Sequence, residues 1–442
     1  MANSKYDVVI VGAGVTGTAL AYVLADFSNV KSIAIIEKND GVAQVNSHPL
    51  NNAQTSHDGS TETNYNLEHA LQVQKAAKLL RSYVVKRGVP KLYKITNRMV
   101  LGVGWKEVHQ LESRFREFSP HYPDLRLVGP RELAEIEPGV MLGRKPDQPI
   151  IALVSDRGFA INYKLLAECL LKDAVRSGKQ VDSFFSTKVE SIRRAGQAYE
   201  VTTDSMKLEA KVVVFAAGSY SLLFAQKLGY AKHLAILPVA GSFYSSGEFL
   251  KGKVYRVQIE GMPFAAIHGD PDVLNQKDTR FGPTTKPLPL MERHHYETLP
   301  DFLRLPLASF RGLLSLVRLI HRRKLYGYIS KNTLYDLPWI GPRMFLKEAR
   351  TIVPSIKHSD LRLRRGVGGI RPQIFNLKTG DLEMGDSSIV GDKIIFNTTP
   401  SPGASICLAN AVRDAQIVTG FLGSDYRFDP KEVEEALSEA TV

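Results

Sequence analysis

The stretch DVVIVGAGVTG, residues 7–17, decides the fold because an apolar strand runs directly into a glycine-rich turn. Gly12, Gly14 and Gly17 have the G-x-G-x-x-G spacing, and a helix is predicted to follow from Thr16. The glycines allow a tight turn, a close approach of the backbone to a pyrophosphate, and close packing of helix on strand. The helix start offers free N–H groups to phosphate. The stretch therefore predicts a dinucleotide site; the alternative is a turn that only packs.

A second predicted strand, 32–37, completes a βαβ unit and ends in Glu37, where a carboxylate can accept from a ribose hydroxyl. Two later segments favour FAD over NAD: VFAAG (214–218), a strand ending in small residues, and TPSPGAS (399–405), a turn that opens a helix. An NAD site is usually complete within one contiguous domain, whereas these segments lie far apart. Beyond the glycines, the predicted cofactor contacts are Val15, Glu37, Lys38, Thr55, Ser56, Val189, Ala217, Gly218, Pro402, Gly403, Ala404 and Ser405.

Composition is that of an ordinary globular protein, with 44% hydrophobic and 23% charged residues. No uncharged apolar run reaches about 18 residues and no cleavage site follows the first strand, so neither a membrane span nor a signal peptide is expected. Cys169 and Cys407 lack metal-ligand spacing, so we expect no metal and a reducing cytoplasm. The net charge of +12 favours an acidic partner, but it is spread along the chain without the basic tail typical of nucleic-acid binding.

The predicted elements divide the 442 residues into two interleaved domains of an α/β (α+β) protein. The nucleotide-binding domain is expected to consist of three separated pieces, 1–90, 150–235 and 360–428. A substrate domain is expected from 91–149 and 236–359, and the acidic residues 429–442 form a tail.

Several stretches, in order along nearly the whole chain, resemble the malate:quinone oxidoreductases, within the FAD enzymes built like D-amino-acid oxidase. These stretches are DVVIVGAGVTG, NNAQTSHDGSTETNY, LPVAGSFY, FAAIHGDPD, TRFGPT, GIRPQ and NTTPSPGAS. The chain looks most like the shorter bacterial branch, and it is also similar to L-2-hydroxyglutarate oxidases. It departs from the longer malate enzymes at Gln54 and Ser56, where those usually have glycine.

The resemblance implies a Rossmann-like FAD-binding domain with an inserted antiparallel-sheet substrate domain. It implies non-covalent FAD, oxidation of (S)-malate to oxaloacetate, and a membrane quinone as electron acceptor. It also implies a peripheral enzyme on the cytoplasmic side of the bacterial inner membrane. The alternatives are an L-2-hydroxyglutarate or other 2-hydroxy-acid oxidase and, from another class, a flavin-bearing nucleic-acid-binding protein.

Oxidation of a secondary alcohol needs a base for the hydroxyl proton, and histidine suits that work near neutral pH. His57, in the polar loop NNAQTSHDGS, and His268, in FAAIHGDPD, are the candidates. We favour His57 as the base and His268 as a group that binds or polarises the substrate, and the reverse assignment stays open. Either histidine could instead have a structural role.

Arginine binds a carboxylate through a planar, bidentate fork. Arg371 in GIRPQ and Arg280 in TRFGP are the candidates for the two carboxylates of malate, and each could instead form a structural salt bridge. Gln373 lies two residues after Arg371, on the same face of a predicted strand, and could donate to the same substrate.

Residues 307–324, LASFRGLLSLVRLIHRRK, predict a basic amphipathic helix. At 100° per residue, Arg311, Arg318 and Arg322 fall within about 40° of one another. The apolar residues opposite are Phe310, Leu313, Leu316, Val317 and Ile320. Such a helix can lie in the headgroup layer of an anionic membrane, or it can pack its apolar face on its own protein core.

Overall fold

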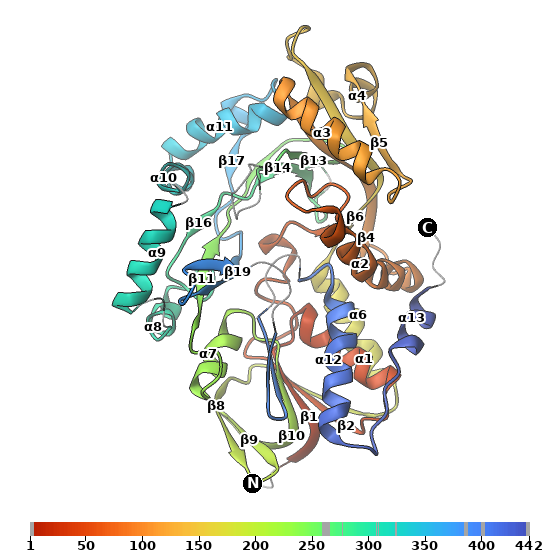
Figure 1. Cartoon of the computed structure of the whole chain (residues 1–442), viewed down its shortest axis with the longest axis vertical. Coiled ribbons are helices and arrows are strands. Elements are labelled where there is room, and N and C mark those ends of the chain that lie inside the picture. Colours follow the sequence, from red (N-terminus) through yellow and green to blue (C-terminus); the bar gives the residue numbers. More distant parts are fainter. Residues whose placement is uncertain are drawn as a thin grey trace.

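A computed structural model describes residues 4–258, 266–275, 277–305, 307, 309–322, 325–383, 388–398 and 403–438, without the side chains of Arg311 and Arg322. Figure 1 shows two lobes, one around the N-terminal strands and one at the opposite end, with a band of helices along one flank. Three β-sheets form the framework of these lobes. The predicted α/β class is confirmed, with sheets of mixed type.

The first sheet draws its strands from both ends and the middle of the chain: β1 (Ser4–Val11), β2 (Ser32–Ile36), β7 (Gln180–Phe184), β8 (Val189–Ala195), β9 (Ala198–Thr203), β10 (Lys207–Phe215), β20 (Ser388–Gly391) and β21 (Ile394–Asn397). Its order is β20-β21-β10-β1-β2-β7, parallel from β21 to β7. Residues 8–10 of β1 are fully buried because helices cover the sheet. One covering layer consists of α1 (Val15–Phe27), α6 (Tyr163–Arg176) and α12 (Cys407–Leu422) (Figure 1).

The second sheet forms the other lobe and has the order β17-β12-β15-β14-β13-β4-β6-β3, with β5 beside β6. Its strands are β3 (Thr55–Ser56), β4 (Tyr93–Val103), β5 (Leu125–Val128), β6 (Ile150–Ile161), β12 (Tyr244–Ser246), β13 (Lys253–Arg256), β14 (His268–Pro271), β15 (Thr279–Gly282) and β17 (Arg362–Leu363). The predicted antiparallel arrangement holds for every pair except β4 and β13, which are parallel. A third, antiparallel sheet joins β16 (Lys286–Pro287), β11 (Leu234–Ala240), β18 (Ile370–Asn376) and β19 (Asp381–Glu383).

The remaining helices flank these sheets. They are α2 (Leu67–Arg87), α3 (Trp105–Phe118), α4 (Pro130–Ile136), α5 (Pro138–Met141), α7 (Ser219–Lys227), α8 (Leu299–Leu303), α9 (Phe310–Arg322), α10 (Tyr326–Tyr335), α11 (Ile340–Ile352) and α13 (Pro430–Ser438). The acidic tail is therefore helical over most of its length, and Val433 and Leu437 pack into the core that α1 shares. No helix among these described residues is long and apolar enough to cross a membrane.

Strand pairing departs from the predicted division into domain pieces at several places. Residues 150–161 were assigned to the nucleotide-binding domain, but they form β6, which pairs with β4. Residues 55–56 also join the second sheet, and β18 leaves the 360–428 piece to pair with β11. The physical reason is that an apolar sequence predicts that a strand will be buried, but it does not predict which other strand will pair with it.

Candidate active site

A cavity of about 1000 Å³ lies where the lobes meet, at the upper end of the range for ligand pockets. Its wall combines segments that are distant in sequence: 14–16, 43–47, 51–55, 187–190, 216–220, 369–372 and 403–405. Such a long cavity suits a dinucleotide rather than a small metabolite alone.

The glycine turn at one side of the cavity has no room for side chains. A Cβ on Gly12 would lie 2.5 Å from the carbonyl oxygen of Ala216, and one on Gly17 would lie 2.0 Å from the oxygen of Gly12. Gly12 also has φ +109°, a conformation that favours glycine. No side chain caps α1 at Gly14, so the positive end of the helix faces the cavity, as phosphate binding requires.

Glu37 lines the cavity at the end of β2. One carboxylate oxygen accepts from the N–H of Ala13 at 2.9 Å, and the other accepts from the backbone and side chain of Asn39. These bonds hold the carboxylate beside the glycine turn, within reach of a ribose hydroxyl. Ser47, which sequence reasoning missed, accepts from the N–H of Val15 at 3.2 Å and closes the same corner.

Most other predicted cofactor contacts also line the cavity: Val15, Lys38, Thr55, Val189, Ala217, Gly218, Gly403, Ala404 and Ser405. Ser56 lies behind the wall, where its carbonyl accepts from Arg81 and Arg98. Pro402 lies outside the described residues. The start of α12 has neither a side-chain cap nor an acidic residue in its first turn, so a second helix dipole can meet an electron-rich group at this end.

His57 lines the cavity, and its backbone N–H donates to Ser405 Oγ at 2.9 Å. Its Nδ1 lies 2.6 Å from Glu62 Oε1. Burial alone would raise the pKa of the Glu62 carboxyl, but Arg98 and the bond with His57 hold that pKa below its ordinary value. The ionised carboxylate therefore orients the ring and leaves Nε2 free to serve a ligand.

His268 is buried on β14 and does not form part of the cavity wall. Neither ring nitrogen has a well-formed hydrogen bond among the described residues. Burial, followed by the charges of Lys253, Arg371 and Arg280, lowers the pKa of His268 well below its ordinary value. The Asp270 carboxylate lies 3.6 Å from Nε2 but is also paired with Arg280 and with Lys253, so these surroundings disfavour a proton on the ring.

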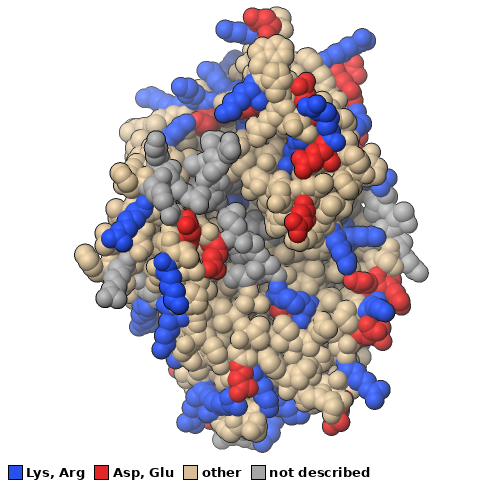
Figure 2. Space-filling model, viewed as in Figure 1, with Lys and Arg blue, Asp and Glu red and all other residues tan. Residues whose placement is uncertain are grey.

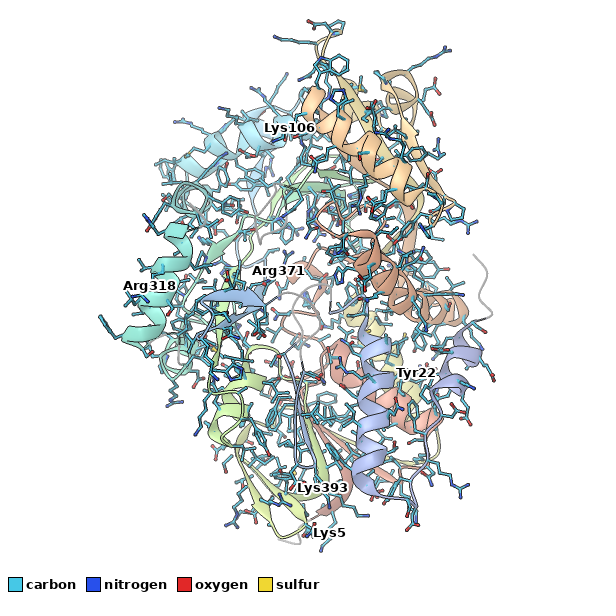
Figure 3. All side chains as sticks on the ribbon, viewed as in Figure 1. Lys5, Tyr22, Lys106, Arg318, Arg371 and Lys393 are labelled. Atoms are coloured by element: carbon cyan, nitrogen blue, oxygen red, sulfur yellow. The ribbon has the colours of Figure 1, made fainter. Side chains whose placement is uncertain are left out.

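The two predicted arginines are placed differently. Arg371 lines the cavity, and Figure 3 shows it at the centre of the molecule, beside the third sheet. Within the described part of the chain, its guanidinium has no hydrogen-bond or ion-pair partner. Arg280 is fully buried outside the wall, where it pairs with Asp270 at 2.8 Å and donates to the Pro49 carbonyl. Gln373 is likewise absent from the wall, so Arg371 is the predicted cation with direct access to a ligand.

Sequence reasoning also missed the ionic groups behind His57. Arg98 is buried on β4 and pairs with Asp58 and, at 3.9 Å, with Glu62. Lys253 donates to the Ala53 carbonyl at 2.8 Å, and burial lowers its pKa to about 8. The only sequence signal for Glu62 was its position five residues after His57 in one polar loop, because Arg98 and Lys253 reach the site only through strand pairing.

Comparison with known proteins gives the class of this fold and site. A family model described as FAD dependent oxidoreductase matches residues 7–409. The L-alpha-glycerophosphate oxidase of Mycoplasma pneumoniae, solved with FAD bound, has a TM-score of 0.66 at 20% identity and covers 97% of both chains. The glycine oxidase of Geobacillus kaustophilus has a TM-score of 0.65 at 17% identity and covers 98% of both. The protein is an FAD-dependent oxidoreductase, and its cofactor is FAD.

Sequence relatives narrow the assignment further. The "Malate:quinone oxidoreductase" of Helicobacter pylori is 36% identical over 97% of each chain. A Campylobacter jejuni protein named "Probable malate:quinone oxidoreductase" is 36% identical over 97% of this chain and 98% of its own. The chain therefore belongs to the malate:quinone oxidoreductase family.

Proposed function

We propose that the protein oxidises (S)-malate to oxaloacetate with FAD and passes the electrons to a membrane quinone, from a peripheral position at the cytoplasmic face of the inner membrane. The names of relatives with matching length support the substrate and the acceptor. The observation that carries the proposal is the cavity wall itself, where a histidine paired with a carboxylate and a guanidinium without a partner among the described residues accompany the predicted cofactor contacts.

Arg371 binds a carboxylate of the substrate. Its guanidinium lines the cavity without a partner among the described residues, so a substrate carboxylate would supply the missing negative charge. Burial lowers the pKa of this arginine, yet the group stays charged at neutral pH. Fixing one carboxylate restricts the rotation of the C2–H bond and lowers the entropic cost of the reaction.

His57 accepts the proton of the C2 hydroxyl. The imidazolium formed at His57 lies 2.6 Å from the Glu62 carboxylate, which stabilises it. An imidazolium at His268 would lie 3.6 Å from Asp270, but that carboxylate is already paired with Arg280, and the nearby charges of Lys253, Arg280 and Arg371 disfavour it. When bound, FAD supplies the acceptor for the hydride that leaves C2. The charges therefore favour His57 as the base, and His268 belongs to the buried cluster with Lys253, Asp270 and Arg280.

Anaerobic titration tests the proposed substrate. The purified holoenzyme is mixed with L-malate, L-2-hydroxyglutarate or lactate, and the flavin absorbance near 450 nm is followed. We expect L-malate to bleach it fastest, and a soluble quinone added afterwards to restore it faster than oxygen does. Faster bleaching by L-2-hydroxyglutarate would move the assignment to that longer acid, and no bleaching by any of the three would refute the proposal.

A further inference from the structure

Helix α9 has three stripes on its surface, not two. Leu319 is buried, and Leu316 and Ile320 pack against the same core, so part of the predicted apolar face belongs to the protein interior. Phe310, Leu313, Leu314 and Val317 form a second apolar stripe, exposed to solvent, with Phe310 82% exposed. At 100° per residue, Arg318 lies about 90° around the helix from the centre of that outer stripe. An exposed apolar row with a basic row beside it has no role in the packing of α9 itself.

The helices that flank α9 also expose large apolar side chains. Figure 1 shows α8, α9, α10 and α11 following one another down one flank of the molecule. Besides the α9 stripe, the exposed large apolar residues of these helices are Leu299, Leu303, Tyr326, Leu334 and Ile340. Leu337 and Trp339, in the turn between α10 and α11, are exposed as well. We call this set, with the outer stripe of α9, the apolar flank. Monomeric proteins rarely expose so many apolar side chains together without a partner for them.

Trp339 is the most exposed residue of the apolar flank, at 85%. It has φ +77°, a left-handed backbone conformation that is rare for a bulky residue and costs about 1–3 kcal/mol. The turn therefore keeps the indole of Trp339 exposed to solvent, although its backbone conformation costs free energy. Tryptophan with one apolar body and one N–H group is enriched at the level of lipid headgroups.

The positive charge of this segment favours a negatively charged partner for the apolar flank. Residues 299–340, which carry the apolar flank, contain seven Lys or Arg residues against two acidic ones, Asp301 and Asp336. Arg304 pairs with Asp301 and Lys331 pairs with Glu348, so the excess of positive charge comes from the other five. Arg318 is exposed and points away from the molecule in Figure 3, and Figure 2 shows basic side chains along the same edge. A surface with this composition attracts a negatively charged plane, because each Lys or Arg near an anionic membrane contributes about 1 kcal/mol.

We propose that the apolar flank is the face with which the protein rests on an anionic phospholipid bilayer, with Trp339 and the Phe310 stripe among the headgroups and acyl chains. A second copy of the chain is a poorer occupant, because two such faces would oppose like charges. The geometry names the lipid-contact residues, and so it deepens the proposed quinone reduction, which itself states no surface for reaching the membrane.

The chain offers an internal reporter pair for this proposal. It has two tryptophans, Trp105 and Trp339, and both are exposed, but Trp105, at the start of α3, lies outside the apolar flank. Trp105→Phe leaves Trp339 as the reporter, and Trp339→Phe leaves Trp105. On mixing each holoenzyme with vesicles that contain phosphatidylglycerol, we expect a blue shift of the Trp339 emission and no shift for Trp105. Phosphatidylcholine vesicles should give a much smaller shift.

A second pair of variants tests the apolar stripe by vesicle sedimentation. Phe310→Ser combined with Val317→Ser should weaken partitioning onto phosphatidylglycerol vesicles by more than about tenfold, because two apolar side chains lose their burial. Leu142→Ser combined with Val175→Ser, at exposed positions outside the apolar flank, is the matched control and should bind like the parent.

Several outcomes would overturn the proposal: equal shifts at both tryptophans, unchanged sedimentation of the Phe310/Val317 variant, or a Trp339 shift that follows protein concentration without lipid, which would indicate self-association. Each variant is also assayed with malate and a soluble quinone. If the parent protein oxidises malate but does not bind vesicles, only the proposed lipid surface is refuted. If the parent protein does not oxidise malate, the proposed function is refuted instead.

Discussion

At the scale of single residues, the site contrasts two histidines in different electrostatic surroundings. His57 lies against the Glu62 carboxylate, whereas His268 faces Asp270 at 3.6 Å together with the cations Lys253, Arg280 and Arg371. Burial and these three cations disfavour a proton on His268.

His57→Asn should slow malate-dependent flavin reduction by about 10²–10⁴-fold, the usual contribution of a general base. The variant should keep its yellow colour, because His57 is not among the phosphate-binding residues. Glu62→Gln should lower the rate at saturating malate by a smaller factor and change the KM for malate little, since it removes only the charge that steadies the imidazolium. Stopped-flow absorbance measures both. A Glu62→Gln variant whose KM for malate rises while its rate at saturating malate stays unchanged would contradict the positioning role.

Asp58 supports the site from behind through ion pairs with Arg98 and Arg81. Burial opposes ionisation, yet these two cations hold the pKa of Asp58 well below its ordinary value. A lowered folded pKa contributes stability that is present above the unfolded value of about 3.9 and is lost as the pH falls further. Asp58→Asn should therefore reduce the free energy of unfolding by about 3–5 kcal/mol at pH 7.

The pH dependence provides the check. Urea unfolding of parent and Asp58→Asn, both as holoenzyme, should show a gap in stability that is constant from pH 7 to pH 5 and narrows below about pH 4. Asp156→Asn, which alters an exposed carboxylate paired with Arg126, is the control and should stay within about 0.5 kcal/mol of the parent. A gap for Asp58→Asn that widens in acid would refute the ionic role.

At the scale of elements, the glycine turn shows how the lack of a side chain at one position allows β1, α1 and the end of β10 to pack closely. Gly12→Ala places a methyl group 2.5 Å from a carbonyl oxygen at φ +109°, so β1, α1 and β10 cannot keep their approach. We expect most FAD to be lost, measured as the ratio of absorbance at 450 and 280 nm. Gly104→Ala is the matched control, because Gly104 also has positive φ, +86°, but no atom lies within 4 Å of its Cβ. It should cost about 1 kcal/mol and retain FAD.

The same contrast explains how far the sequence could predict this protein. The turn at Gly12 and the carboxylate of Glu37 were predictable because their geometry depends on neighbours in sequence. The sheet of β6 was not, because β4 and β3 had to be located first. Nor could the sequence predict that Arg280 and Arg371 have different roles. Asp270 lies directly opposite Arg280 on the paired strands β14 and β15 and forms an ion pair with it. Register between strands, absent from local patterns, decided which arginine reaches the cavity.

At the scale of the whole molecule, the cofactor cavity joins the lobes, so FAD should stabilise both together. A ligand present at about 1000 times its Kd adds about 4 kcal/mol to the folded state. Removal of FAD should lower the midpoint of thermal unfolding, and added FAD should restore it in a concentration-dependent way, followed by circular dichroism. FMN, which lacks the adenosine that Glu37 would hold, is the control and should restore less. An apoprotein with an unchanged midpoint would contradict a shared cavity.

The position of α13 has a consequence for how the chain is made. Val433 and Leu437 complete the interior beneath α1, and β21, which borders β10, lies within about the last 50 of the 442 residues. Strand β1 leaves the ribosome hundreds of residues before these partners are made, so the nascent polypeptide carries an unfinished apolar edge until residues 394–397 and 430–438 have emerged. Nascent chains stalled before residue 430 should therefore be captured by chaperones rather than fold.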